Sequence, residues 1–428
     1  MTWFRGLACV VFPAVVMLAC TGVGTASAQT AQTAANGCVA CHASLPDARL
    51  SAPPAALQGD VHQTHGFSCV DCHGGDASAA EKVAAHSAAK GYRGKPAGKD
   101  VITVCARCHS DAELMHKFAP RQRVDQAAEY ATSVHGKRLA SGDTKVATCI
   151  SCHGAHGVRL VNDAKSPAFP TNVAATCGGC HASAEHMKGY TLPDGKPLPT
   201  SQLADYQRSV HHAALTKNND LSAPTCNDCH GNHGAAPPGV SSLTTVCGTC
   251  HTVFATKFAT SVHAQIFERA CIECHSNHAV LQPSDEMLGT SSQTVCASCH
   301  SDKDDPGYVA SAKMRASIDR FKHGIDSSAN LIGRVKNAGM EVGDDELALN
   351  EARTRLVLAR TEMHAFDPGS LDGVVAEGMK ILAGVDQAGN RSLAELAYRR
   401  RGLFVSLAAI LLVVIALVFK IKGLEAKS

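Results

Sequence analysis

The sequence predicts a mainly α-helical protein with extensive loops, followed by a small helical bundle and one C-terminal transmembrane helix. Three observations lead to this fold class. Turn-forming residues such as Gly74-Gly75 recur between residues 38 and 300, which favours short helices joined by loops. Apolar residues recur at alternating spacings of four and three from Met314 onward, as in packed helices. An uncharged stretch of 18 residues, 402–419, is long enough to cross a bilayer.

The cysteines follow one pattern, C-x-x-C-H, which occurs nine times. This pattern is typical of covalent c-type haem attachment, because two thiols form thioethers with the haem vinyl groups and the adjacent histidine ligates the iron. The alternative is a set of zinc ribbons, since paired C-x-x-C motifs also suit tetrahedral zinc. Zinc gives no reason for a histidine after every second cysteine. The sequence therefore predicts nine covalently bound c-type haems.

The predicted attachment residues account for 18 of the 20 cysteines, and the other two are Cys9 and Cys20. The predicted thioether residues are Cys38, Cys41, Cys69, Cys72, Cys105, Cys108, Cys149, Cys152, Cys177, Cys180, Cys226, Cys229, Cys247, Cys250, Cys271, Cys274, Cys296 and Cys299. The predicted proximal iron ligands are His42, His73, His109, His153, His181, His230, His251, His275 and His300.

The N-terminus carries the features of an export signal. Arg5 precedes an apolar run, and Ala26-Ser27-Ala28 forms a small-residue cleavage site, so residues 1–28 are predicted to be a signal peptide. A competing interpretation makes Cys20 a lipidated cysteine. Either route exports the chain, which c-type haem attachment also requires.

An internal repeat organises the predicted nine-haem domain, residues 29–300. Each copy reads CxxCH, then aromatic-x-x-Ser-Val-His, then CxxCHxxH. Copies occupy residues 105–157, 177–234 and 247–278, and a half copy occupies 296–300. Residues 38–86 form a degenerate earlier copy, in which Asp76 stands where the final histidine would be.

Histidines outside the motifs recur at two sites of the repeat, and haem iron commonly takes a second histidine. We therefore predict seven distal ligands: His62, His135, His156, His211, His233, His263 and His278. Two spare histidines, His65 and His86, could repair the degenerate copy. His323 and His364 lie on the C-terminal helices, and either could reach the ninth haem if the bundle folds back.

Composition fits such an array. Aromatic residues make up only 4% of the chain, which is low for a chain that must bury a core, unless haem supplies the apolar interior. The net charge of +2 is too small to indicate the strongly basic surface that binds nucleic acid.

The C-terminal third is predicted to be free of haem. Two heptad stripes and a weaker third helix, about 371–385, predict a bundle over residues 301–398 that serves as a spacer or dimerisation stalk. The transmembrane helix, 402–419, is flanked by Arg399-Arg400-Arg401, Lys420 and Lys422 as interfacial anchors. Haem attachment outside the cytoplasm then places the tail, 420–428, inside. We expect a single-pass protein of the bacterial inner membrane with its haem domain in the periplasm.

Residues 38–300 resemble multihaem c-type cytochromes with doubled CxxCH motifs. The resemblance implies electron transfer rather than substrate conversion. We expect a relay between a quinol-oxidising or cytochrome b-type membrane partner and periplasmic redox proteins, with the lipid bilayer holding the C-terminal helix. The alternative is a multihaem reductase or oxidase of a small nitrogen or sulfur compound, which needs one open haem. A haem storage or scaffold protein is a third interpretation.

Overall fold

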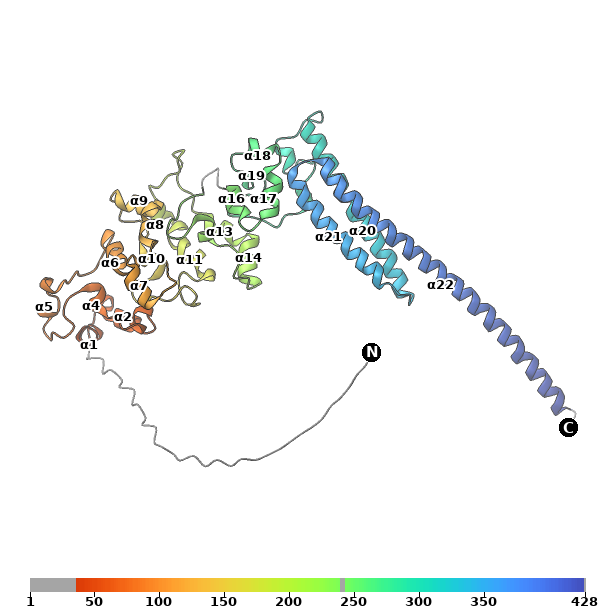
Figure 1. Cartoon of the computed structure of the whole chain (residues 1–428), viewed down its shortest axis with the longest axis horizontal. Coiled ribbons are helices and arrows are strands. Elements are labelled where there is room, and N and C mark those ends of the chain that lie inside the picture. The colour runs from red at the N-terminus through yellow and green to blue at the C-terminus, as the bar shows by residue number, and fades with distance from the viewer. Residues whose placement is uncertain (1–35, 239–242, 427–428) are drawn as a thin grey trace, which may run out of the picture. The chain divides into compact units, whose positions relative to one another are not determined.

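The computed structural model describes residues 36–238 and 243–426. Across these residues the chain is mainly helical and contains no β-strand, so the predicted mainly α fold with extensive loops is confirmed (Figure 1). The predicted signal peptide, 1–28, lies outside the described residues, together with Cys9 and Cys20. The last two residues of the predicted tail also lie outside them.

The described chain divides into two compact units, the first of which comprises residues 36–55 and 69–94. Its elements are α1 (Gly37–Ala43), α2 (Ala48–Ala56), α4 (Cys69–His73), α5 (Lys82–Ala85) and η1 (Ala88–Lys90). Gly74 leaves the second motif with a φ of +68°, and a Cβ there would lie 2.0 Å from the Gly91 carbonyl oxygen. The chain therefore needs glycine at this exit.

The second unit begins with a run of short helices that carry the remaining motifs. They are α3 (Val61–Thr64), α6 (Lys99–His109), α7 (Ala112–Phe118), α8 (Gln126–Thr132), α9 (Val134–Ala140), α10 (Cys149–His153), α11 (Pro170–His181), α12 (Ala184–Met187), α13 (Gln202–Gln207), α14 (Val210–Lys217), α15 (Cys226–His230), α16 (Leu243–Gly248), α17 (Thr252–Ala259), α18 (His263–Ile266), α19 (Ile272–His275), η3 (Asp285–Met287) and η4 (Cys296–Ser298). Most motifs coincide with a short helix or end one, whereas the motifs at Cys247 and Cys296 begin in a helix and continue past its end.

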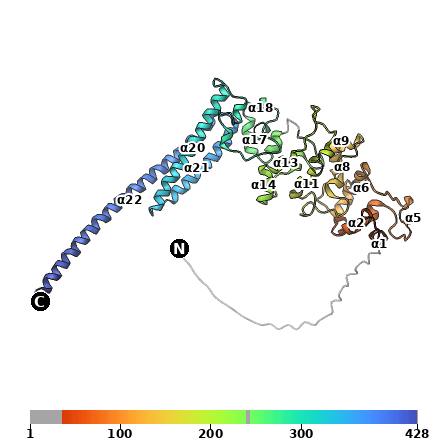
Figure 2. The same ribbon diagram turned by 180° about the vertical axis from the view of Figure 1, so that it is seen from behind.

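A helical bundle follows, built from α20 (Pro306–Asn337), α21 (Gly343–Glu362), η5 (Met363–Ala365) and α22 (Pro368–Glu425). The three long helices lie side by side in both views of the chain (Figures 1 and 2). The heptad positions of α20 form the core, where Ile318 and Phe321 have no exposed surface. Gly378 of α22 allows close approach, because a Cβ there would lie 2.0 Å from the Phe321 ring.

The predicted third bundle helix and the predicted membrane span are parts of one helix of 58 residues, α22. No proline interrupts it between the two parts. One 18-residue window of α22 has a mean hydropathy of 3.0, and none of that window is buried. By length and composition, this part of α22 is compatible with single-pass membrane anchoring.

Candidate functional site

Histidines of the CxxCH motifs lie opposite other histidines, and the spacing repeats. In eight pairs the ring centroids are 5.9 to 6.3 Å apart: His42–His86, His109–His62, His153–His233, His181–His135, His230–His278, His251–His211, His275–His364 and His300–His263. Each pair combines one histidine of a motif with one histidine from outside the motifs.

This spacing fits one metal ion between two imidazoles. A metal–imidazole bond is about 2 Å long, so two ligating nitrogens on opposite sides lie about 4 Å apart and the ring centroids about 6 Å apart. The interplanar angles range from 11° for His230–His278 to 83° for His62–His109. Direct ring stacking would favour one orientation, whereas an axial imidazole can turn about its bond to the metal. The shared distance and the variable angle therefore match the geometry of two axial ligands.

Hydrogen bonds at Nδ1 prepare several of these rings for ligation. Nδ1 lies 2.8 Å from the Lys82 carbonyl oxygen in His86 and 3.2 Å from the Ala236 carbonyl oxygen in His230. Because a carbonyl oxygen only accepts, Nδ1 carries the hydrogen and Nε2 keeps the lone pair that a metal requires. His42 makes the same kind of contact with Leu50.

Two other rings turn Nδ1 toward a carboxylate. Nδ1 of His62 lies 3.1 Å from the Asp60 carboxylate, and Nδ1 of His300 contacts Asp305. A carboxylate partner makes an imidazole a more basic ligand.

Two further predicted ligands belong to the degenerate copy and to the copy after it: His73 and His156. His73 donates from Nδ1 to the Gly94 carbonyl oxygen at 2.7 Å, and His156 is exposed after α10. Of the two spare histidines in the degenerate copy, His86 faces His42, whereas the His65 ring packs 5.8 Å from Phe118.

His364 faces a different motif from the one that the sequence predicts. The sequence predicts that His364 could reach the haem of the ninth motif. Its ring instead lies opposite His275 of the eighth motif. The ninth motif's His300 faces His263 instead. The signal that could have pointed to His364 is the end of the repeat: the second motif of the third copy has no later CxxCHxxH segment to follow it.

The serine of each Ser-Val-His segment explains how its histidine is positioned. Ser133 is fully buried, and its hydroxyl accepts from the Gly136 N–H at 2.8 Å, which caps α9 beside His135. Ser209 caps α14 in the same way beside His211. Asp60 performs this role in the degenerate copy, where its carboxylate accepts from the His62 N–H.

The aromatic residue of the repeat links its own helix, α8 or α13, to the segment just before the next motif by a hydrogen bond. The Tyr130 hydroxyl donates to the Ala147 carbonyl oxygen at 2.7 Å, two residues before Cys149. The Tyr206 hydroxyl donates to the Pro224 carbonyl oxygen at 3.0 Å, two residues before Cys226. Burial raises the pKa of both phenols to about 12, which keeps them protonated as donors.

Backbone hydrogen bonds join one copy of the repeat to the next. In each case the N–H of the valine before one predicted distal histidine donates to the carbonyl oxygen two residues after another predicted distal histidine. The pairs are Val61–Val158 (2.8 Å), Val134–Ala235 (3.0 Å) and Val210–Val280 (2.8 Å). The two distal positions of neighbouring copies are therefore held together. As a result, His233 faces the motif at Cys149, and His278 faces the motif at Cys226, each in the preceding copy.

A family defined by a doubled CXXCH motif matches residues 263–305, which include the motifs at Cys271 and Cys296. No curated protein and no solved structure gave a match to this chain. The zinc alternative needs three or four ligands around one ion, and the described residues contain no group of three or more such side chains. The motifs indicate a multihaem c-type cytochrome.

Within each copy of the cytochrome's repeat, the first thiols of the two motifs are hydrogen-bonded, at Cys38–Cys69, Cys105–Cys149, Cys177–Cys226 and Cys247–Cys271. The bond from Cys105 lowers the pKa of Cys149 to about 7. Haem attachment would convert these sulfurs to thioethers, so the contacts mark where two predicted attachment points adjoin.

Between copies, the second cysteine of one copy lies near a cysteine of the next copy. Burial, then Cys149 and Cys180, raises the pKa of Cys152, so the Cys180 sulfur is close enough to act on it. Equivalent electrostatic effects join later copies, at Cys229–Cys250 and Cys274–Cys296. Within the second unit, the attachment points therefore adjoin one another in sequence order from Cys105 to Cys299.

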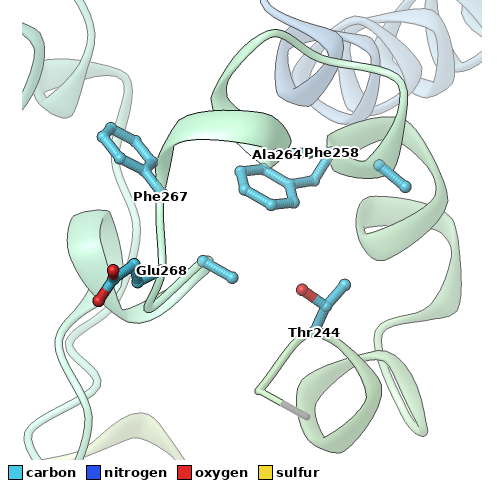
Figure 3. A pocket seen from close by; sticks show the side chains of 7 residues that line it. Thr244, Phe258, Ala264, Phe267 and Glu268 are labelled. Atoms are coloured by element: carbon cyan, nitrogen blue, oxygen red, sulfur yellow. The ribbon is translucent and has the colours of Figure 1, made fainter. Parts of the chain in front are cut away.

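An open pocket of about 650 Å³ lies beside α17 and α18. Phe258, Ala264 and Phe267 line it with apolar surface, and Thr244 and Glu268 add polar atoms (Figure 3). The pocket lies near the motifs at Cys247 and Cys271 in sequence.

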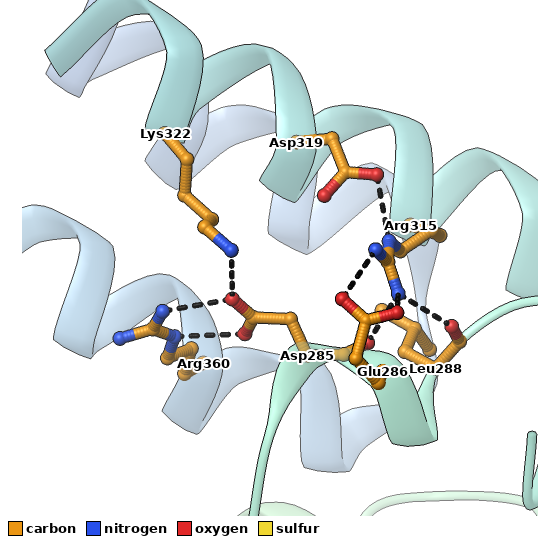
Figure 4. Close-up of polar contacts among 7 residues, drawn as sticks. All are labelled: Asp285, Glu286, Leu288, Arg315, Asp319, Lys322 and Arg360. Atoms are coloured by element: carbon orange, nitrogen blue, oxygen red, sulfur yellow. Dashed lines mark hydrogen bonds and ion pairs between the residues drawn. The ribbon is translucent and has the colours of Figure 1, made fainter. Parts of the chain in front are cut away.

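Ion pairs join the segment between the last two motifs to the bundle. The Asp285 carboxylate accepts from Arg360 of α21 at 2.8 and 2.9 Å, and it pairs with Lys322 of α20 at 2.9 Å (Figure 4). Arg315 pairs with the neighbouring Glu286 at 2.9 Å. We call residues 36–300, which carry the nine motifs, the haem array, and these contacts hold its C-terminal end against the bundle.

Proposed function

We propose that this protein is a membrane-anchored nonahaem cytochrome that relays electrons in the periplasm. The observation that supports it most directly is the set of eight histidine pairs whose centroids lie 5.9 to 6.3 Å apart. Haem iron held at these sites supplies one-electron chemistry. The two cysteines of each motif would attach a haem, and the paired histidines would ligate the iron at the eight sites where such a pair is present.

The order of the attachment points supports a relay. Successive cysteine pairs adjoin from Cys105 to Cys299, as the Cys105–Cys149 and Cys274–Cys296 interactions illustrate. Closely spaced one-electron centres suit stepwise transfer along a chain. We propose that electrons enter from a quinol-oxidising or cytochrome b-type membrane partner and leave to soluble periplasmic redox proteins.

Two axial histidines favour a relay over an enzyme. A six-coordinate iron has no open position for a small nitrogen or sulfur compound, and little rearranges when its charge changes. We propose His62, His135, His156, His211, His233, His263 and His278 as distal ligands, together with His86 rather than His65. For the nine motif histidines the proposed role is the proximal one.

The anchoring scheme completes the proposal. Residues 1–28 are removed on export, α22 crosses the inner membrane at residues 402–419, and the tail 420–428 stays in the cytoplasm. Arg399, Arg400 and Arg401 precede the apolar stretch, and Lys420 and Lys422 follow it. Such residues anchor a helix at the two interfaces.

Low-temperature EPR of the oxidised full-length protein tests the proposal, with mass spectrometry of the same sample. We expect nine covalent haems, a chain that starts at Gln29, and only low-spin iron. A mass that corresponds to eight or fewer haems would contradict the count. A high-spin haem that reacts with nitrite or hydroxylamine would favour the enzyme.

A further inference from the structure

His364 lies outside the haem-binding repeat, yet it faces a motif histidine in the same way as the repeat's own histidines. It lies on η5, the single turn that joins α21 to α22. Its ring centroid is 6.2 Å from that of His275, with an interplanar angle of 16°. The distance falls within the range of the other seven pairs.

The hydrogen bonds of His364 leave Nε2 available. Nδ1 lies 3.1 Å from the Arg360 carbonyl oxygen and 3.3 Å from that of Thr361. Both oxygens can only accept, so Nδ1 carries the hydrogen and the Nε2 lone pair is free. A backbone carbonyl at the second ring nitrogen is the usual arrangement for a histidine that ligates metal.

The repeat also leaves a position that His364 can take. In the first two complete copies the second motif faces a histidine of the following copy, as His153 faces His233 and His230 faces His278. The third copy's second motif ends in His275, and the array then stops at a half copy, 296–300. No later CxxCHxxH segment exists for His275, and His364 lies where that ligand would be.

The residues around His364 contact the third Ser-Val-His segment in the way that neighbouring copies of the repeat contact each other. In the repeats, the residue two positions past such a histidine contacts the preceding Ser-Val-His segment, as Val280 accepts from the Val210 N–H. Two positions past His364 is Phe366, whose ring lies 4.2 Å from His263 of the third Ser-Val-His segment. Phe366 has a φ of +54°, a conformation that a bulky residue adopts rarely, so its packing holds it there.

Contacts with α17 hold η5 in place. The Phe254 ring lies 4.9 Å from His364. Lys257 pairs with Glu362 at 2.8 Å, and the Glu362 side chain is only 13% exposed. His364 is therefore carried by a turn that packs against the haem array.

We propose that His364 is the second axial ligand of the haem attached at Cys271 and Cys274. Because η5 directly precedes α22, this ligand binds the membrane-anchoring bundle to the array through iron. The bundle thus takes the place of a fourth repeat and closes the array. This inference rests on the proposed function, since it assumes that the array is built from haems with two histidine ligands.

The test is the substitution His364→Ala in the full-length, haem-loaded protein. We expect one haem per chain to become high-spin by EPR and to bind one equivalent of carbon monoxide, and added imidazole to restore the low-spin signal. His323→Ala is the matched control. His323 is the other bundle histidine, it is exposed on α20, and its loss should leave every haem low-spin.

A second variant, His364→Met, keeps a ligand at the position and covers the case in which the alanine variant fails to fold. A methionine ligand gives a near-infrared charge-transfer band and raises the potential of its haem. We expect one such band and one haem with a raised potential. If the His364→Met protein shows only haems with two histidine ligands, the inference is overturned.

His278→Ala distinguishes a failure of this inference from a failure of the proposed function. If His278→Ala produces one high-spin haem while His364→Ala changes nothing, His364 is not a ligand and the proposed array stands. If neither substitution changes any haem, the proposed array of histidine pairs is wrong, and the inference is overturned with it.

Discussion

The haem array and the helical bundle are stabilised in different ways. In the bundle, apolar side chains of α20, α21 and α22 form one continuous core, with Ile318, Phe321 and Val375 fully buried. In the described part of the array, buried apolar residues such as Leu139 and Leu215 are scattered. Buried serines cap helices there instead. The bundle supplies its own apolar core, whereas the described residues of the array form no comparable core.

Haem removal should have the largest effect, and it should act on the array alone. If the full chain is produced without covalent haem attachment, we expect residues 36–300 to lose their tertiary structure, because they lack an apolar core of their own. The bundle should remain helical. Limited proteolysis followed by mass spectrometry should yield a protected fragment that begins near Pro306. Equal protection of array and bundle would contradict the comparison.

Phe321→Ala should reverse that pattern. The side chain is fully buried against Gly378, so its loss should lower the free energy of unfolding of the bundle by about 3–5 kcal/mol. The visible spectrum of the haems should not change. Urea unfolding followed by far-ultraviolet circular dichroism measures the effect, with Leu347→Ala as the control because Leu347 is 71% exposed. Destabilisation of the array to the same extent would show that the two regions share one core.

His233→Ala should change a single haem inside the array. We expect attachment at Cys226 and Cys229 to persist, because the thioethers do not depend on His233. One haem, the one at Cys149, should become high-spin and bind carbon monoxide, since His233 faces His153. EPR and carbon monoxide titration measure the change, and exposed His116→Ala is the control. Unchanged low-spin signals in His233→Ala would show that His233 is not the distal ligand of that haem.

Ser133→Ala should have a smaller effect. The serine hydroxyl caps α9, and loss of an N-cap costs about 1 kcal/mol. We expect reduced thermal stability with nine haems still attached and His135 still positioned. The control is Ser110→Ala, an exposed serine after α6. If Ser133→Ala melts at the same temperature as the unsubstituted protein, the repeated serine needs another explanation.

The smallest expected effect is a pH dependence where array and bundle meet. Burial raises the pKa of Asp285, but hydrogen bonds from Arg360 and Lys322 outweigh it, so the net pKa is lowered. A carboxylate with a lowered pKa stabilises the folded state above its unfolded value of about 3.9, and this contribution is lost as the pH falls below it. Melting temperatures below about pH 4 should therefore fall less steeply in Asp285→Asn than in exposed Asp344→Asn. Parallel curves would exclude this contribution.

Local and periodic features were readable from the sequence alone. Nine CxxCH motifs, the repeat with its Ser-Val-His segments, the heptad stripe from Met314 and the apolar stretch at 402–419 each depend on residues a few positions apart. Helix formation and haem attachment are local events, so such patterns carry their own structural meaning. The mainly α fold followed from them, and the ligand roles of the histidines remain predictions.

Only the tertiary structure decided which histidine faces which motif. His233 is three residues from its own motif's histidine, yet it faces His153 in the preceding copy. His86 rather than His65 faces His42, and His364 faces His275. An axial ligand must approach from the opposite side of the porphyrin plane, which a residue on the same short turn cannot reach. The partner therefore comes from another segment, and the packing between copies, not sequence distance, selects it.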